Sequence, residues 1–517
     1  MSSMDDATLK TRRAFLSLLG KAGVKVTLAA ALWESLGSKG LAGTTAPATS
    51  QAASESATRA SHVEHIKVRA DNWGFVGKES GQPFVPFGCN YYDPDTDWPP
   101  KIWRDFDADR VRRHFELMQG LGVNVCRVFL SVKTFMPRKG ELSADGLKKL
   151  DTMIAIGKEH GIRFDLSALN NWEGRPQWWR GDFWSDPDVL AGEAAYLEAL
   201  FSHYRGEGAI FCVDLANEPQ VTWNSPQMRS QWNQWLRREL ANRPDEDQAP
   251  LRAYMQAHGE DVPPPPDKPA ENDPVLYAYQ CFREWIGTRW AQQNAQAVKR
   301  GDPDRLVSTG LVQWSFPLAN SPSGYAAVNP QQIAEAMDFT SVHFYPILAN
   351  ERRLSEQFPL MQQYCKAWVR YAWCGKPIVV EEFGWAGGGP KEDSGYYTQQ
   401  EQAAWNTGLI ELTRDSACGW LVWPFADCID SKDVSKWAGL LTQDGKMKAW
   451  GTAFQGLARQ FKGNPPVRSR PEKTIRVNMR RALTTLGEKI PMYETRYSRE
   501  LLSQFTLDGS WNVVQER

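Results

Sequence analysis

Eight short apolar runs alternate with stretches of helical periodicity along most of this chain, and this alternation restricts the possible folds more than any other feature. The runs cover residues 84–90, 123–130, 162–169, 209–217, 305–312, 339–345, 377–382 and 418–424. Short runs that are rich in β-forming residues and apolar on both faces are typical of strands buried within a parallel sheet.

Helical patterns separate these runs. Leu147, Leu150 and Ile154 recur at helical spacing, and further patterns cover residues 108–121, 187–204, 277–300, 354–373, 399–414 and 446–461. Strands that alternate with helices predict an α/β fold, and eight of them predict a parallel (β/α)₈ (TIM) barrel, since a doubly wound sheet stops at about five or six strands. The active site of such a barrel forms at the C-terminal ends of its strands.

Two segments exceed a minimal barrel. A long insertion follows the fourth strand, at about residues 222–275, and we expect it to cap one end of the cleft. Its Trp223, Trp232 and Trp235 are either sugar platforms or packing residues of an inserted helix. A Pro/Arg-rich extension covers residues 463–517, with its basic residues expected at the solvated surface, so we predict the barrel domain at 61–462.

Residues 1–60 do not resemble part of a barrel. Arg12 and Arg13 precede a modestly apolar run, and an Ala/Ser/Thr-rich stretch follows at 42–60. This pattern is similar to a twin-arginine export signal with a linker, the alternative being a short amphipathic helix. We therefore expect an exported protein, periplasmic or extracellular, that keeps no stable membrane anchor after its signal is removed.

The composition narrows the classes of partner. A net charge of −1 gives no support for nucleic acid or an anionic membrane as a partner, whereas the 23 tryptophans suit the flat faces of sugar rings. The eight cysteines show no CxxC spacing of a metal site, and Cys89, Cys126, Cys212 and Cys418 lie in predicted strands as reduced core residues. The sequence does not decide whether disulfide bonds join Cys365 to Cys374 or Cys418 to Cys428.

Two of the predicted strands end in acidic residues. The fourth ends at residues 214–219 (DLANEP), and the seventh runs through residues 377–384 (PIVVEEFG). A single strand-end carboxylate can simply be solvated, but two at one barrel rim are what glycoside cleavage by double displacement requires. Glu381 competes with Glu382 for this position, because adjacent strand residues face opposite sides. For the same reason, Asn217 and Glu218 reach one site only if the strand is bulged or turning.

Other strand ends carry polar and aromatic residues. Arg127 lies among apolar residues of the second strand, where a buried arginine needs a carboxylate partner. His343 and Tyr345 are two positions apart on the sixth strand and so face one side. The third strand is followed by residues 170–172 (NNW), and Trp423 ends the eighth.

These motifs, in this order over residues 64–462, resemble glycoside hydrolase family 5 and its β-mannanase-like branch. The resemblance implies that Glu218 is the general acid/base and Glu382 the nucleophile. It also implies that Arg127 and Tyr345 support the nucleophile and that Asn217 binds the sugar 2-hydroxyl. His343 would help to shape the site, and Trp423 would stack against the sugar. Substrate contacts are expected as well from Asn170, Asn171, Trp172, Trp314 and Trp385.

We therefore predict a retaining β-glycosidase that acts on a β-1,4-linked polysaccharide or oligosaccharide, with no metal or organic cofactor. Asn170 and Asn171, in place of the histidine of many cellulase-type members, favour mannan or glucomannan. A cellulase-type glucanase or an exo-β-glycosidase of the same family is the alternative. A non-catalytic carbohydrate-binding barrel is disfavoured because both acids are present, and a non-glycosidase barrel enzyme because phosphate-binding glycine motifs and clustered metal ligands are lacking.

Overall fold

The computed structural model describes residues 63–96, 101–266, 272–318, 321–346, 354–390, 397–468, 471–484, 495–506, 509 and 511–516. The predicted export signal and its linker, residues 1–60, lie outside these residues. Among the described residues, no helix has the length and apolar character needed to cross a membrane.

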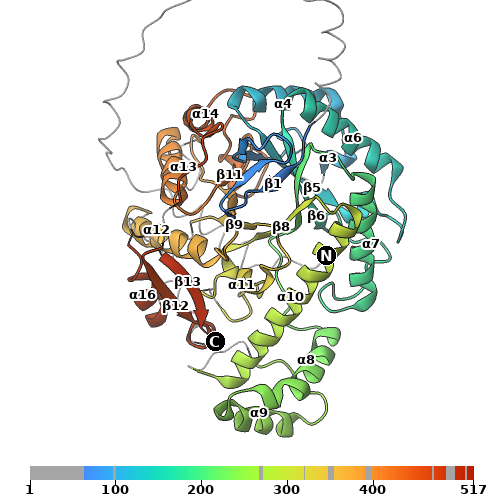
Figure 1. The fold of residues 1–517 in the computed structure, drawn as a ribbon, viewed down its shortest axis with the longest axis vertical. Coiled ribbons are helices and arrows are strands. Elements are labelled where there is room, and N and C mark those ends of the chain that lie inside the picture. Colours follow the sequence, from blue (N-terminus) through green and yellow to red (C-terminus); the bar gives the residue numbers. More distant parts are fainter. Residues whose placement is uncertain are drawn as a thin grey trace, which may run out of the picture.

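Eight parallel strands close into a barrel, as predicted (Figure 1). In barrel order they are β4 (Phe87–Asn90), β5 (Val125–Ser131), β6 (Arg163–Asn170), β7 (Ile210–Asn217), β8 (Leu306–Leu311), β9 (Thr340–Phe344), β10 (Ile378–Phe383) and β11 (Gly419–Val422). Nearly every strand residue is buried, because helices cover the outer face and side chains fill the interior.

Long helices follow most of the strands and form the outer layer. They are α4 (Ala108–Leu121), α6 (Ala144–Glu159), α7 (Pro187–His203), α10 (Pro274–Gly301), α12 (Leu354–Tyr371), α13 (Gln399–Thr413) and α14 (Ala449–Phe461). Shorter helical turns occupy the connections: α3 (Lys101–Arg104), α5 (Val132–Phe135), η2 (Gln313–Ser315), α11 (Pro330–Ile333) and η3 (Val434–Lys436).

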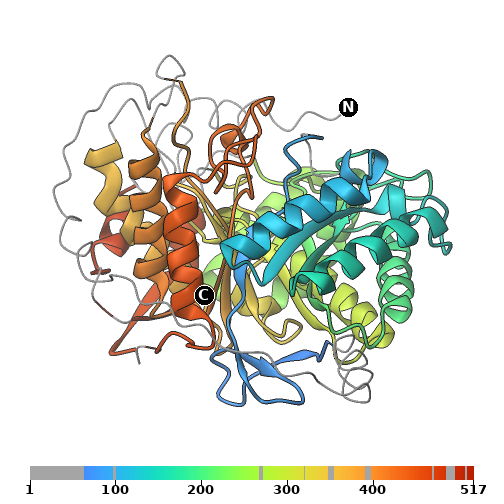
Figure 2. The same cartoon turned by 90° about the horizontal axis from the view of Figure 1, so that it is seen from above.

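A small antiparallel sheet closes the barrel at the N-terminal ends of its strands (Figure 2, blue). It consists of β1 (Ile66–Val68), β2 (Phe75–Gly77) and β3 (Pro83–Phe84). Phe75 packs edge-on against Phe211 and Phe339, with ring centroids 5.2 and 5.3 Å away. This plug leaves the opposite end of the barrel, where the strands finish, for the candidate site.

The insertion after β7 forms α8 (Pro226–Glu239), η1 (Leu240–Asn242) and α9 (Asp245–His258) before α10 begins. Trp232 and Trp235 stack on each other and contact Phe282 of α10, and both are buried. These two tryptophans are packing residues of the insertion, and the sugar-platform alternative is wrong for them.

The C-terminal extension packs on the barrel with a parallel pair of strands, β12 (Lys473–Asn478) and β13 (Trp511–Glu516), and two short helices, α15 (Met479–Thr484) and α16 (Arg496–Leu502) (Figure 1, red). Its buried Ile475 and Val477 belong to the main hydrophobic core. Arg480 pairs with Asp247 of α9, so the basic residues of this extension are not all solvated.

Candidate active site

Glu218 stands at the C-terminal end of β7, where the backbone leaves the strand. The β7–β8 register shifts between Asp214 and Asn217, and Glu218 has a left-handed backbone with φ of 49°. Its N–H donates to the carbonyl oxygen of Gly310 on β8, at 2.9 Å. This bulge and turn place the side chains of Asn217 and Glu218 at one site, as the rim of a barrel allows.

A second bulge lies beneath Glu382. The register between β9 and β10 shifts between Val380 and Glu382, so Glu381 and Glu382 both contact Arg127. Strict strand alternation is therefore wrong at this position. Glu381 is fully buried below the rim, whereas Glu382 retains slight exposure at it.

Arg127 of β5 is the fully buried centre of the site. One guanidinium nitrogen, Nη1, lies 2.5 Å from Glu382 Oε1 and 2.9 Å from Asn90 Oδ1. The other, Nη2, lies 2.6 Å from Asp214 Oδ2 and 2.9 Å from Asn217 Oδ1. Burial opposes the charged guanidinium, but the surrounding carboxylates outweigh burial and raise the pKa of Arg127 well above its usual value.

Tyr345 and His343 of the β9 end complete the contacts to the two acids. The Tyr345 hydroxyl donates to Glu382 Oε2 at 2.9 Å. His343 Nδ1 lies 3.2 Å from Glu218 Oε1 and 3.6 Å from Glu382 Oε1, while Nε2 lies 3.1 Å from Glu381 Oε2. Burial alone would lower the pKa of His343, but Glu382, Glu218 and Glu381 together raise it to about 10.

Aromatic side chains surround this polar centre. Trp423 lies edge-on to Tyr92 and Phe129, with ring centroids 5.5 and 5.7 Å away, and its indole N–H donates to Ser435. Trp172 packs against Phe129 at 5.3 Å, which extends the same wall. The wall therefore joins one residue within β5 to residues that follow β4, β6 and β11.

Three more of the predicted substrate contacts, Trp385, Asn170 and Trp314, differ in their surroundings. Trp385 is fully buried against Tyr397 and Trp405, so the expectation that it contacts a sugar is wrong. The side-chain amide of Asn170 donates to Leu130 and Ser167, and its oxygen accepts from the Asn217 N–H at 3.4 Å, so it orients the end of β7. Trp314 is half-buried in η2.

Several residues of the site were missed from the sequence. Asp165 and Asp214 are fully buried acids inside the barrel, and Gly310 leaves the space in which Glu381 and His343 meet. The available signal was an acid within an apolar strand, as in residues 164–166 (FDL), because such an acid must face a partner.

Two groups among the described residues bring three potential metal-ligand atoms within 4.8 Å of one another. One is Glu218, His343 and Glu382, in which the raised pKa of His343 opposes metal binding because a protonated imidazole offers no lone pair.

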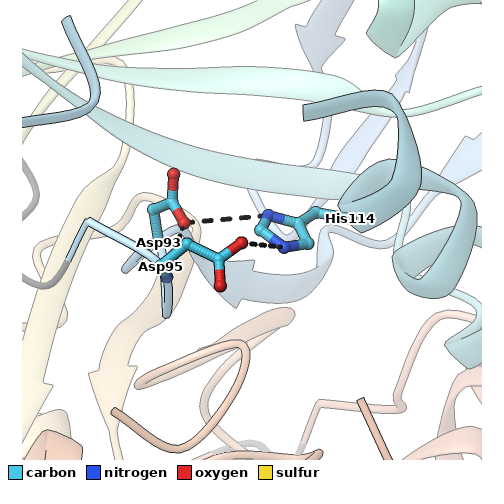
Figure 3. A group of neighbouring side chains, drawn as sticks. All are labelled: Asp93, Asp95 and His114. Carbon is cyan, nitrogen blue, oxygen red and sulfur yellow. Dashed lines mark hydrogen bonds and ion pairs between the residues drawn. The ribbon is translucent and has the colours of Figure 1, made fainter. Parts of the chain in front are cut away.

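The other group consists of Asp93 and Asp95, which follow β4, and His114 of α4 (Figure 3). Asp93 already pairs with Arg110 at 3.0 Å, and His114 Nδ1 lies 2.8 Å from the Tyr91 hydroxyl. Burial outweighs the two aspartates and lowers the pKa of His114. Arg110 thus already neutralises the charge of Asp93, and Tyr91 already occupies one ring nitrogen of His114.

Comparisons with known proteins find similarity to sugar-cleaving enzymes over parts of the chain. The family model described as β-galactosidase, glycoside hydrolase family 42 of clan A, matches residues 185–387. Mannan endo-1,4-β-mannosidase A of Emericella nidulans is 27% identical over 187 residues, which is 31% of this chain and 48% of that protein. The match thus spans about half the length of that relative.

A longer match links the chain to mannan endo-1,4-β-mannosidase 7 of Oryza sativa subsp. japonica, 24% identical over 59% of this chain and 74% of that protein. Among solved structures, GH5_18 from Streptomyces cattleya in complex with GlcNAc has a TM-score of 0.58 at 18% identity, covering 84% of this chain and 94% of that chain. This likeness supports the barrel fold.

Proposed function

We propose that the protein is a retaining β-glycosidase of glycoside hydrolase family 5 that cleaves β-1,4-linked mannan or glucomannan. The observation that carries the proposal is the spacing of its acids, since a carboxylate oxygen of Glu218 lies within 4.8 Å of one of Glu382. Retaining enzymes hold their carboxyl groups about 5–5.5 Å apart, whereas inverting enzymes leave about 6.5–9.5 Å for a water molecule.

The contacts of the two acids divide the chemical roles between them. Arg127 and Tyr345 bind both oxygens of Glu382, which orients that carboxylate for attack on the anomeric carbon. Glu218, with 23% of its side chain exposed, has the access that a proton donor to the leaving oxygen needs. Water enters in the second step, gives its proton to Glu218 and releases the sugar from Glu382.

Neighbouring residues would hold the sugar. The bond from Arg127 to Asn217 Oδ1 leaves the Asn217 amide N–H groups to donate to a 2-hydroxyl. Trp423 and Trp172 offer apolar ring surface on the aromatic wall, as a pyranose face requires. Asn171 and the half-buried Trp314 remain proposed contacts farther along the substrate.

Mannan is the proposed substrate class because the two curated relatives described above carry that activity in their names. Mannose differs from glucose in the axial 2-hydroxyl, and a site built to bind that group loses roughly 1–3 kcal/mol when the group is absent. That free-energy difference corresponds to a rate on mannan on the order of ten- to a hundredfold higher than on glucan. We therefore expect some activity on β-glucan beside that on mannan. β-Galactosides are the second candidate, since the matching family model is that of a β-galactosidase.

The test is hydrolysis of glucomannan, galactomannan, carboxymethyl-cellulose and aryl β-mannosides, β-glucosides and β-galactosides, with the products resolved by size and anomeric form. We expect mannans to be the best polymers and the first product to keep the β configuration. An α-configured first product would contradict the retaining mechanism. Inert mannans beside a cleaved glucan or galactoside would contradict the substrate class.

Paired variants test the two acids. Glu382→Ala should abolish turnover, while Glu218→Ala should retain part of its activity on activated aryl glycosides, whose leaving groups need little protonation. Glu198→Ala, on the outer surface of α7, is the control for loss of a glutamate. Near-normal turnover by Glu382→Ala would overturn the assignment.

We also propose that residues 1–60 are a twin-arginine signal and linker, supported by Arg12 and Arg13, and that residues 463–517 extend the barrel domain. The packing of Ile475 and Val477 into the main core supports the second statement.

A further inference from the structure

Asp165 is a buried acid of β6 that the proposed chemistry does not use. Its register partners are Arg127 on β5 and Cys212 on β7, and it is 1% exposed. Neither of its carboxyl oxygens accepts from an N–H or hydroxyl group of the described residues, and beside it Cys212 offers only a thiol, which is a weak donor. A fully ionised carboxylate in such a place would lack the partners that buried charges require.

Asp214, on the neighbouring strand β7, has the hydrogen-bond donors that Asp165 lacks. Its oxygens accept from Arg127 Nη2 at 2.6 Å, from the Gly310 N–H at 2.8 Å and from the Ala216 N–H at 3.1 Å. Two neighbouring acids of the same type therefore differ in their number of donors. Burial raises the pKa of both, but only Asp214 has hydrogen-bond donors that favour its ionised form.

The Asp165 carboxyl group is a hydrogen-bonding neighbour of another carboxyl group, that of Glu381. Two carboxyl groups bond to each other only when one of them holds a proton, because two carboxylates in contact repel. Glu381 already accepts from the Ser341 hydroxyl at 2.8 Å and from His343 Nε2 at 3.1 Å, and Arg127 Nε lies 3.5 Å away. The donors favour the ionised form of Glu381, so the proton belongs on Asp165.

The charges of the surrounding groups also favour a proton on Asp165 and a negative charge on Glu381. Burial raises the pKa of Asp165 well above its usual value, and the charges of Glu381 and Asp214 outweigh the opposing effect of Arg127. Burial would also raise the pKa of Glu381, but Arg127 and His343 lower it to about 2.

We propose that Asp165 stays protonated and donates a hydrogen bond to Glu381, which keeps Glu381 and His343 as an ion pair beneath Glu218 and Glu382. Asp165 is thus a positioning residue that acts through two other side chains. Its effect on catalysis rests on the proposed function, whereas its protonation does not.

The consequence follows from how a donated hydrogen bond changes proton affinity. A neutral donor stabilises the Glu381 carboxylate, so without it Glu381 binds a proton more tightly. The nearest proton is that on His343 Nε2, and its transfer to Glu381 leaves a neutral imidazole. The positive charge 3.2 Å from Glu218 and 3.6 Å from Glu382 is then lost.

Infrared difference spectroscopy at pH 7 tests the protonation without any substrate. Subtracting the spectrum of Asp165→Asn from that of the wild type should reveal the C=O band of a protonated carboxylic acid. The matched control is Asp214→Asn on the neighbouring strand. Subtracting its spectrum from that of the wild type should reveal no such band. Absence of the band with Asp165→Asn would overturn the proposal.

Nitrogen-15 NMR of His343, assigned by its loss in His343→Gln, tests the consequence. Asp165→Leu should lower the pH at which His343 loses its proton and reduce kcat/KM on the order of tenfold, and Asp165→Asn, which keeps a donor, should restore both. An unchanged titration in folded Asp165→Leu would overturn the proposal. If no glycoside is cleaved by the wild type, the infrared and NMR results still decide the proton assignment, so its failure is separable from failure of the proposed function.

Discussion

Nη1 of Arg127 lies 2.5 Å from Oε1 of Glu382, although 255 residues separate them in the chain. Both side chains are largely buried, which makes the attraction stronger than the same pair would have in water. The pair joins the second and seventh strands of the barrel, so it can form only when the sheet has closed. The orientation of the proposed nucleophile is therefore a product of barrel closure.

Tyr345→Phe removes the second contact to Glu382. We expect kcat/KM to fall on the order of ten- to a hundredfold, because a hydrogen bond to a charged group contributes roughly 1.5–3 kcal/mol. Steady-state kinetics on the best aryl glycoside measure the loss. Tyr204→Phe, which removes a hydroxyl bonded to Asp151 between α6 and α7, is the control and should leave the rate unchanged. Equal rates for Tyr345→Phe and the wild type would remove Tyr345 from the site.

Gly310→Ala tests the space beneath the catalytic pair. An added Cβ would lie 2.7 Å from Glu381 Oε2 and from His343 Nε2, and 3.0 Å from Arg127 Nη2. These side chains are buried and paired, so we expect activity to fall at least tenfold together with the melting temperature. Gly456→Ala is the control: it lies within α14 with nothing within 4 Å of its added Cβ, and it should stabilise the protein by about 1 kcal/mol. Full activity in Gly310→Ala would show that Glu381, His343 and Arg127 do not pack tightly around residue 310.

Glu193 of α7 should make stability depend on pH. Burial raises its pKa to about 8, against the hydrogen bonds from Asn294 and Trp290. An unfolded glutamate loses its proton near pH 4.5 while the folded one holds it to about 8, so unfolding releases a proton in this window and stability falls as pH rises.

Glu193→Gln removes that ionisable group. Its free energy of unfolding relative to wild type should rise between pH 5 and 8 by about 1 kcal/mol or more, as measured by denaturant unfolding. Glu198→Gln, on the exposed surface of the same helix, is the control. A difference that does not change with pH would show that Glu193 titrates normally.

Replacing Arg12 and Arg13 with lysine should retain the precursor in the cytoplasm of a bacterial host, because the twin-arginine receptor reads the arginine pair. Immunoblots of cytoplasmic, periplasmic and culture fractions measure the distribution. Replacing Lys21 and Lys25 with arginine is the control, since it leaves the pair intact. An unchanged exported yield in the first variant would contradict the signal assignment.

The sequence alone determined the barrel and the strand ends on which its acids stand. Eight apolar runs with helical patterns between them locate the strands within a few residues, because burial on both faces and a 3.6-residue period are local properties. Glu218 and Glu382 were found the same way, as acids that end apolar runs. The surface or core position of an aromatic residue is not local, and Trp385 was therefore assigned to the substrate while it packs against Trp405.

Only the tertiary structure decided which polar groups meet inside the barrel. The bulges beneath Asn217 and Glu382 depend on the hydrogen-bond register with β8 and β9, which no single strand encodes. Arg127 and Gly310, which donate to Asp214, and Glu381, which neighbours Asp165, all come from other strands, so the two acids differ because one meets N–H donors and the other meets a carboxyl group. Proton affinity in a closed core is set by the neighbours that closure supplies, and the linear order of the residues does not contain them.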